Sequence, residues 1–214
     1  MSVGGQNGTG GRFGAVALVA SLGGLDAISV VLACLPATFD TPVIVVQHGR
    51  RNADQERFTS VIAARTALPT RTATPGGSLA QPGVVVVPTG WDATVDSAGR
   101  FLLTPSTLLR SGDILLSGLA RLLGPAAIGV ILTGMQSDGA RGVQAVKRRG
   151  GRVLVQDPTT ARAGGMPSAA LATGCVDFLL PLDRIAAALI TLTMAPGGAD
   201  LLTVPTPHWA TLPA

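Results

Sequence analysis

GAVALVASLGG, residues 14–24, is the stretch of sequence that decides the fold class. Its first seven residues are small or apolar without a break, which is typical of a parallel strand buried on both faces. Gly23 and Gly24 permit a tight turn, and the apolar spacing that continues to about Leu35 predicts a helix. A buried strand that enters a helix through a short turn is the start of a βαβ unit, so this stretch indicates a parallel sheet.

The same alternation of strand-length apolar runs with helical patterns continues along the chain. Further strands are predicted at residues 42–47, 83–87, 128–132, 152–156 and 176–180, and helices at residues 53–66, 113–123, 139–149, 167–173 and 183–193. Residues 94–103 are predicted to form a hairpin that turns at residues 97–99. The expected fold is an α/β, doubly wound, mainly parallel sheet with helices on both faces and a small β-hairpin.

Length and composition suit one domain with a large core. The chain has 214 residues, of which 47% are hydrophobic and 13% are charged, and these proportions exclude a chain that is disordered throughout. We expect residues 1–11, which are rich in glycine, to be a flexible N-terminus and residues 12–194 to form the folded domain. Residues 195–214 are expected to be a Pro-rich C-terminal tail.

Charge and cysteine content argue against several classes of function. The net charge is +4 and aromatic residues make up 3%, and the densest cationic run, Lys147 to Arg149, falls at a predicted helix end, where cations suit the helix dipole. We therefore do not expect binding to nucleic acid. Cys34 and Cys175 lie in apolar segments without metal-ligand spacing, so we expect two buried free thiols and neither a metal nor another cofactor. No stretch has the pattern of a signal peptide or a membrane span, and we expect a cytoplasmic protein without membrane insertion.

Three predicted strands are followed by side chains that can take part in covalent catalysis, namely Ser21, His48 and Asp138. In doubly wound sheets ligands bind beyond the carboxyl ends of the strands, which is where these side chains would meet. A serine nucleophile needs a base, and a histidine base needs an acceptor that fixes its tautomer. The other histidine of the chain, His208, lies in the expected tail. The sequence therefore predicts a serine hydrolase with His48 as its base.

Each of these residues also has another interpretation that the sequence leaves open. Ser21 before two glycines fits a turn that needs only small residues, or a helix start that binds an anion. Neither a phosphate-binding glycine pattern nor the GxSxG elbow is present, since Val19 stands at the first glycine position of the elbow. His48 also fits a polar residue that ends a strand, and Asp138 fits a cap for the helix that follows it.

At these residues the chain resembles the catalytic domain of the chemotaxis receptor methylesterases (protein-glutamate methylesterase and protein-glutamine glutaminase). The resemblance covers roughly residues 13–192. The matching segments are ASLGG (residues 20–24), VQH (46–48), LTGM (132–135), DGA (138–140) and GMP (165–167). It implies that residues 12–194 are a methylesterase-like catalytic domain that stands alone. The receiver domain that precedes this domain in the family is not expected, nor is phosphorylation control within this chain.

The resemblance also implies roles for single residues. Ser21 would be the nucleophile, His48 the base and Asp138 the residue that orients the base. The N–H groups of Leu22 and Met135 would hold the oxyanion, with Gly23 and Gly134 beside them in the cleft. The implied reaction is hydrolysis of glutamate γ-methyl esters on chemotaxis receptors, which releases methanol, with possible deamidation of glutamine and no cofactor. The implied partners are the methyl-accepting receptors and a separate regulatory protein.

The chain departs from the family's usual pattern at three places around the expected cleft. Val19 stands where the family has glycine, Gly49 and Arg50 stand where it has Met-Pro, and Asp92 stands where it commonly has histidine. These changes put substrate choice and activity in doubt. Two rival functions therefore stay open, which are an esterase or amidase with the same triad and another substrate, and a divergent scaffold that is not an enzyme.

Four arginines follow the predicted base, namely Arg50, Arg51, Arg57 and Arg65. As a hypothesis, they attract acidic receptor helices, and association would then weaken with salt. A solvated arginine face fits the same pattern.

Overall fold

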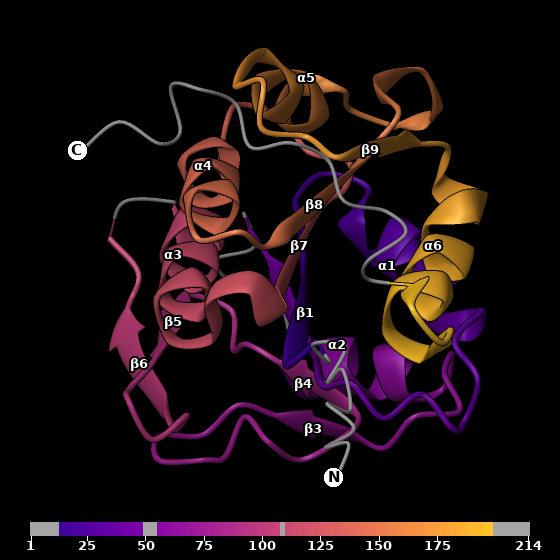
Figure 1. Cartoon of the computed structure of the whole chain (residues 1–214). Helices are drawn as coiled ribbons and strands as arrows, with labels where there is room; N and C mark the ends of the chain where they lie inside the picture. Colours follow the sequence, from indigo (N-terminus) through magenta and orange to yellow (C-terminus); the bar gives the residue numbers. More distant parts are fainter. Residues whose placement is uncertain (1–12, 49–54, 108–109, 199–214) are drawn as a thin grey trace, which may run out of the picture.

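The computed structural model describes residues 13–48, 55–107 and 110–198. A seven-stranded parallel sheet forms its centre, in the order β3-β4-β2-β1-β7-β8-β9. Strand β1 (Ala15–Ala20) is the middle strand, with β2 (Val43–Gln47) on one side and β7 (Ala127–Ile131) on the other (Figure 1). The direction of winding reverses at β1, so the carboxyl end of this strand is the switch point at which α/β sheets bind ligands.

The remaining elements follow the predicted order. The other strands of the sheet are β3 (Thr70–Thr72), β4 (Val84–Val86), β8 (Arg152–Gln156) and β9 (Phe178–Leu180), and β5 (Trp91–Val95) pairs with β6 (Phe101–Pro105) as an antiparallel hairpin. The helices are α1 (Gly24–Ala33), α2 (Gln55–Ala63), α3 (Ser111–Leu123), α4 (Ala140–Arg148), α5 (Gly165–Ala172) and α6 (Leu182–Met194), with short 3-10 turns η1 (Gly124–Ala126) and η2 (Pro158–Thr160). The predicted α/β class, parallel sheet and hairpin are confirmed.

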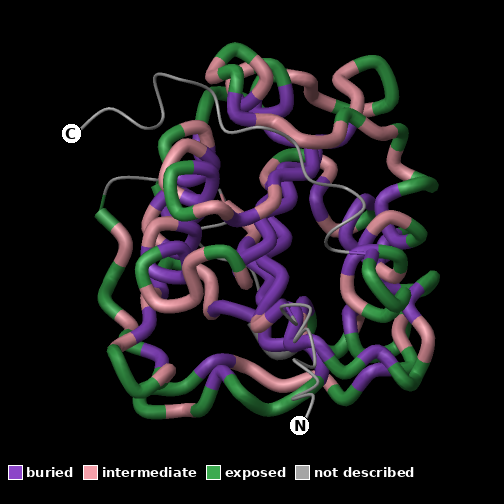
Figure 2. The backbone as a smooth tube through the Cα atoms, in the orientation of Figure 1, coloured by how far each residue is buried: buried purple, intermediate pink, exposed green. Residues whose placement is uncertain are grey.

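The alternation of side chains along β1 creates two hydrophobic cores. Val16, Leu18 and Ala20 face a core shared with α1, α2 and α6. Ala15, Ala17 and Val19 face a core shared with α3, α4, α5 and the hairpin. Since successive residues of a strand point to opposite faces, a strand covered on both faces must be apolar throughout. Figure 2 shows the middle of the sheet buried along its length, with exposed residues on the outer turns.

Strand β3 was not predicted from the sequence. Its three residues, Thr-Arg-Thr, carry no apolar signal, and it forms the edge of the sheet beside β4. The guanidinium group of Arg71 donates to the carbonyl oxygens of Gln81 (2.9 Å) and Pro82 (3.0 Å). Backbone pairing and these side-chain bonds hold a segment that its composition alone describes as a loop.

Two expectations about single residues were wrong. Cys34 is exposed, because it follows the last turn of α1, whereas Cys175 is buried as expected. Lys147 is also not a solvated cation at the end of α4. It is 2% exposed and pairs with the buried carboxylate of Asp177, which accepts the backbone N–H of Val153 at 2.8 Å as well.

No helix in the described part of the chain is long and apolar enough to cross a membrane. Within the same residues no group of His, Cys, Asp and Glu side chains has the arrangement of a metal site. The expected flexible N-terminus at residues 1–11, and the tail from residue 199 onward with His208, lie outside the described residues.

Candidate active site

Ser21 lies at the turn between β1 and α1, at the switch point of the sheet. Its N–H donates to the carbonyl oxygen of Thr133 (2.9 Å), and its own carbonyl oxygen accepts the N–H of Gly24 (2.8 Å). Gly23 has a φ of 80°, which glycine adopts without strain. Gln47 Nε2 donates to the Ser21 carbonyl at 3.4 Å. The turn is therefore tied to two neighbouring strand ends, and this fixes the position of the Ser21 side chain.

His48 follows β2 and lies beside Ser21 because the two strands are paired in register. Ala20 is opposite Gln47, and the His48 N–H donates to the carbonyl oxygen of Ala20 at 2.8 Å. The imidazole Nδ1 is 3.2 Å from Oδ2 of Asp138, although 90 residues separate the two in the chain. The His48 side chain is 11% exposed. His48 is thus more than a polar strand end, since a carboxylate fixes its ring.

Asp138 is held by the start of a neighbouring helix. Its Oδ2 accepts the N–H of Gly112 (2.9 Å) and its Oδ1 accepts the N–H of Asp113 (3.0 Å), both in the first turn of α3. The helix after Asp138 has Gly139 at its N-cap and no side-chain capping bond. Asp138 therefore caps α3 and not the helix that follows it, and the positive end of the α3 dipole favours its charged form.

A second buried carboxylate supports this arrangement. Asp113 Oδ1 accepts the N–H of Gly142 at 2.8 Å, which joins the start of α3 to α4. Burial raises the pKa of Asp113 above its ordinary value, the Gly142 hydrogen bond opposes this shift, and the charge of the nearby Asp138 adds to it. The two helix starts that surround Asp138 are therefore linked to each other as well as to the carboxylate.

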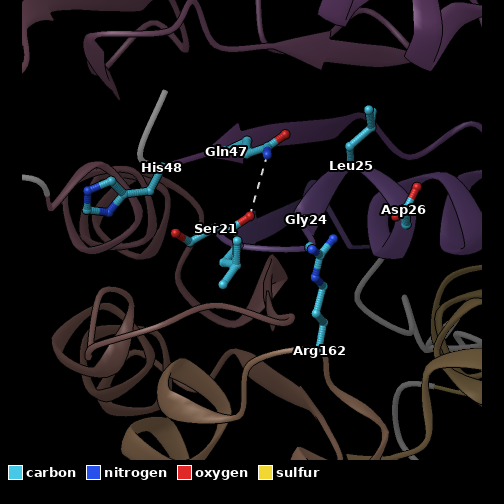
Figure 3. Close-up of a pocket in the computed structure, with 9 residues that line it drawn as sticks. Ser21, Gly24, Leu25, Asp26, Gln47, His48 and Arg162 are labelled. Carbon is cyan, nitrogen blue, oxygen red and sulfur yellow. Dashed lines mark hydrogen bonds between the residues drawn. The ribbon is translucent and has the colours of Figure 1, made fainter. Parts of the chain in front are cut away.

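Ser21 and His48 line one open cavity of about 340 Å³. Gly24, Gln47 and Arg162 also contribute to its wall. Figure 3 shows the hydroxyl group of Ser21 on the side of that residue that faces the His48 imidazole. Hydrogen bonds between a nucleophile and its base are often loose in the absence of substrate. This geometry fits a Ser–His–Asp relay, in which each group lies on a separate strand end.

Two backbone N–H groups near Ser21 are available to a ligand. Within the described residues, neither Leu22 N nor Met135 N donates a hydrogen bond to another backbone group, and both residues are exposed, at 46% and 60%. The loop that carries Met135 lies against the nucleophile, since a Cβ on Gly134 would come 2.9 Å from Cβ of Ser21. The expected oxyanion donors and Gly134 thus lie on two loops that meet at Ser21.

The departure at Val19 has a structural counterpart in Gly112. Val19 is fully buried in β1, and its side chain points toward α3. A Cβ on residue 112 would overlap Cγ1 of Val19 and would lie 3.0 Å from Oδ2 of Asp138. The missing side chain of Gly112 therefore makes room for Val19 and lets the backbone of α3 approach the carboxylate. Sequence reasoning missed Gly112, because nothing in its local sequence shows which strand packs on it.

We expect G112A to lower the free energy of unfolding by about 1–3 kcal/mol, the usual cost of overpacking a core. It should also lower ester hydrolysis, because the displaced helix start lengthens the bonds to Asp138. The double variant V19A/G112A removes the overlapping Cγ1 and should recover much of both losses. Denaturant titration and hydrolysis rates for the two single variants and the double variant test this, and additive losses would contradict it.

Asp92 and the arginines occupy places that differ from those expected. Asp92 does not line the Ser21 cavity; it is 6% exposed and accepts the hydroxyl of Ser111 at 2.6 Å, at the start of α3. Arg50 and Arg51 lie outside the described residues. Arg65 forms a wide, exposed pair with Asp26 at 4.0 Å. Of the three departures, only Val19 is placed by the structure directly behind the site.

Comparisons with known proteins decide the family. The sequence profile of the CheB methylesterase family matches residues 16–189. The chain belongs to the CheB methylesterase family. It is 38% identical over 179 residues to the protein-glutamate methylesterase FrzG of Myxococcus xanthus, which covers 82% of this chain and 53% of that protein. It is 36% identical over 195 residues to a protein-glutamate methylesterase/protein-glutamine glutaminase of Moorella thermoacetica, which covers 85% of this chain and 45% of that protein.

A solved structure agrees with this assignment to the CheB methylesterase family. The crystal structure of the Thermotoga maritima CheB methylesterase catalytic domain matches with a TM-score of 0.77 at 28% sequence identity, over 85% of this chain and all of that one. The chain spans about half the length of the curated relatives that it matches. The family resemblance expected from the ASLGG, VQH and LTGM segments is confirmed.

Proposed function

We propose that this chain is a protein-glutamate methylesterase, a carboxylic-ester hydrolase that acts on glutamate γ-methyl esters of chemotaxis receptors with Ser21, His48 and Asp138 as its triad. One observation carries the proposal. The Nδ1 atom of His48 lies 3.2 Å from a buried carboxylate, and the same imidazole shares a cavity with Ser21. The names of the relatives support the substrate class.

The first half of the reaction follows from the orientation of the imidazole. Asp138 accepts the proton on Nδ1, which leaves Nε2 unprotonated and able to take the proton of the Ser21 hydroxyl. The Ser21 oxygen then attacks the ester carbonyl carbon. The N–H groups of Leu22 and Met135 would stabilise the oxyanion, and one such donor is typically worth about 3–4 kcal/mol. The C–O bond to the methoxy group breaks, and His48 supplies the proton that releases methanol.

The second half restores the enzyme. His48 takes a proton from water, the resulting hydroxide attacks the acyl carbon, and the bond to Ser21 breaks with return of the proton to its oxygen. The product is the free glutamate side chain. Glutamine deamidation follows the same steps with ammonia as the leaving group. No step requires a metal or a cofactor.

The wider setting is part of the same proposal. The substrate is a receptor protein, and regulation comes from a separate protein. We also propose a cytoplasmic location, because the free thiols of Cys34 and Cys175 suit a reducing compartment.

A substrate comparison tests the proposal. We expect kcat/KM for methanol release from a receptor fragment with methylated glutamates to exceed that for small methyl esters by at least about a hundredfold, because remote binding energy positions the reacting group. The unmethylated fragment serves as the blank. Faster turnover of small esters than of the receptor fragment would favour another esterase function, and no turnover of either would favour a scaffold.

A further inference from the structure

Arg162 is a cation on the wall of the nucleophile cavity that the proposed reaction does not use. It lies between η2 and α5 and lines the cavity together with Ser21 and His48. Figure 3 shows its side chain running alongside the turn that carries Ser21, with the guanidinium group beside Gly24. Arg162 is exposed at its surface position, so a ligand that enters the cavity can reach it.

The backbone beside Arg162 is fixed to the catalytic loops. The N–H of Ala163 donates to Thr133 Oγ1 at 2.9 Å, and Thr133 Oγ1 donates to the carbonyl oxygen of Leu22 at 2.9 Å. The carbonyl oxygen of Ala163 accepts the N–H of Gly134 at 2.9 Å. The segment therefore keeps a constant distance from both the nucleophile turn and the LTGM loop.

The stem of the Arg162 side chain packs on the nucleophile turn itself. A Cβ on Gly23 would lie 2.9 Å from Cβ of Arg162 and 3.0 Å from its Cδ. The absence of a side chain at Gly23 thus leaves room for the arginine, and the turn restricts the directions in which it extends. A guanidinium group held in this way loses less freedom on binding than one on an open surface.

The charge of Arg162 is not matched by another residue of the cavity. The carboxylate that also lines the cavity, Asp26, has a side chain 75% exposed and pairs with Arg65 at 4.0 Å. The structure assigns no ion pair to Arg162 within the described residues. The N-terminal end of α1, at Gly24, adds partial positive charge to the same wall. The cavity is therefore complementary to a substrate that carries a negative charge next to the reacting ester.

We propose that Arg162 is a specificity-determining residue that binds a carboxylate of the protein substrate, from an acidic side chain next to the esterified glutamate. This inference rests on the proposed function. On a helical substrate, a side chain three or four positions away lies about 5–6 Å from the reacting one, which suits a guanidinium group on the cavity wall. A guanidinium group binds a carboxylate through two parallel hydrogen bonds, so the contact also orients the helix.

Two helical peptides test the proposal. Both contain one glutamate γ-methyl ester, and they differ by glutamate or glutamine four positions away. For the natural chain we expect kcat/KM to be about fivefold higher for the acidic peptide, mainly through KM, which is the scale of a partly exposed ion pair. The preference should decline as salt is added.

Variants of Arg162 should change this preference. R162Q should bring the ratio of the two kcat/KM values close to one, R162K should keep part of it, and R162E should reverse it. R121Q is the matched control, because Arg121 is an exposed cation at the end of α3 that does not line the cavity, and it should keep the natural ratio. An unchanged ratio in R162Q and R162E would overturn the proposal.

A binding measurement separates this inference from the proposed reaction. Fluorescence anisotropy of the two labelled peptides with S21A and with S21A/R162Q reports affinity without turnover. Tighter binding of the acidic peptide to S21A, lost in S21A/R162Q, supports the role of Arg162 even if no methanol is released. Equal binding of both peptides to both variants would overturn it, whatever the hydrolysis assay shows.

Discussion

Replacement of Asp138 by asparagine is expected to lower kcat for ester hydrolysis by about ten-thousandfold, as the loss of the orienting carboxylate does in other Ser–His–Asp enzymes. The reason lies in the hydrogen bonds that the carboxylate accepts. Oδ2 faces both Nδ1 of His48 and the N–H of Gly112, and Oδ1 faces the N–H of Asp113. An amide has one oxygen and one NH₂ group, so one of these positions must receive a donor in place of an acceptor.

Both orientations of the asparagine are unfavourable. If the NH₂ group takes the place of Oδ2, it faces the N–H of Gly112 and makes Nδ1 of His48 the acceptor. The proton then sits on Nε2, which can no longer accept the proton of Ser21. If the NH₂ group takes the place of Oδ1, it faces the N–H of Asp113, and the cap of α3 is lost. We therefore expect a modest loss of stability together with the large loss of rate.

Asp96 offers a matched control for D138N. Its carboxylate also accepts two backbone N–H groups, those of Ala98 and Arg100, both at 2.9 Å, but it lies in the exposed hairpin turn. D96N should keep the natural kcat. Hydrolysis rates with a small activated ester and thermal unfolding of all three proteins check the prediction. A kcat for D138N within tenfold of the natural value would contradict the role given to Asp138.

Replacement of Ser21 by alanine is expected to have the largest effect of any single substitution, a fall in kcat of about a million-fold. The hydroxyl oxygen is the atom that bonds to the substrate, so its loss removes the covalent intermediate, and what remains is attack by water at the oxyanion site. Stability should change little, because within the described residues the Ser21 side chain makes no recorded hydrogen bond and the backbone bonds of the turn stay in place.

A serine close to the site provides the control for S21A. Ser168 is exposed on α5, the helix that follows Arg162, and S168A should keep the natural rate. Equal losses in both variants would indicate damage to this region of the fold and not loss of a nucleophile. Substrate affinity, measured by anisotropy, should be similar in S21A and S168A.

The strand ends that carry the site were predictable because the sheet has a simple pattern. Apolar runs before Ser21, before His48 and before the LTGM segment indicate parallel strands, and their carboxyl ends must lie at one edge. The family resemblance then supplied roles for these residues. Spacing alone does not show that Asp138 reaches His48, since that contact depends on the packing of the loop after β7 against the start of α3.

Other features were beyond the reach of the sequence for physical reasons. The exchange of space between Val19 and Gly112 is a contact across 93 positions, and a glycine near a helix start has many explanations. Arg162 lies in a polar loop, where one more arginine carries no signal until the fold places it on the cavity wall. Cys34 was expected to be buried because its neighbours are apolar, but the end of α1 turns its side chain outward.

The most direct test of the central claim is methanol release from chemoreceptor membranes whose glutamates carry labelled methyl groups. The natural chain and S21A are compared at equal concentration, with S168A as the control. The account predicts release of labelled methanol by the natural chain and by S168A, and none above background by S21A. Release by S21A at the natural rate would contradict Ser21 as the nucleophile, and no release by the natural chain would contradict the proposed substrate.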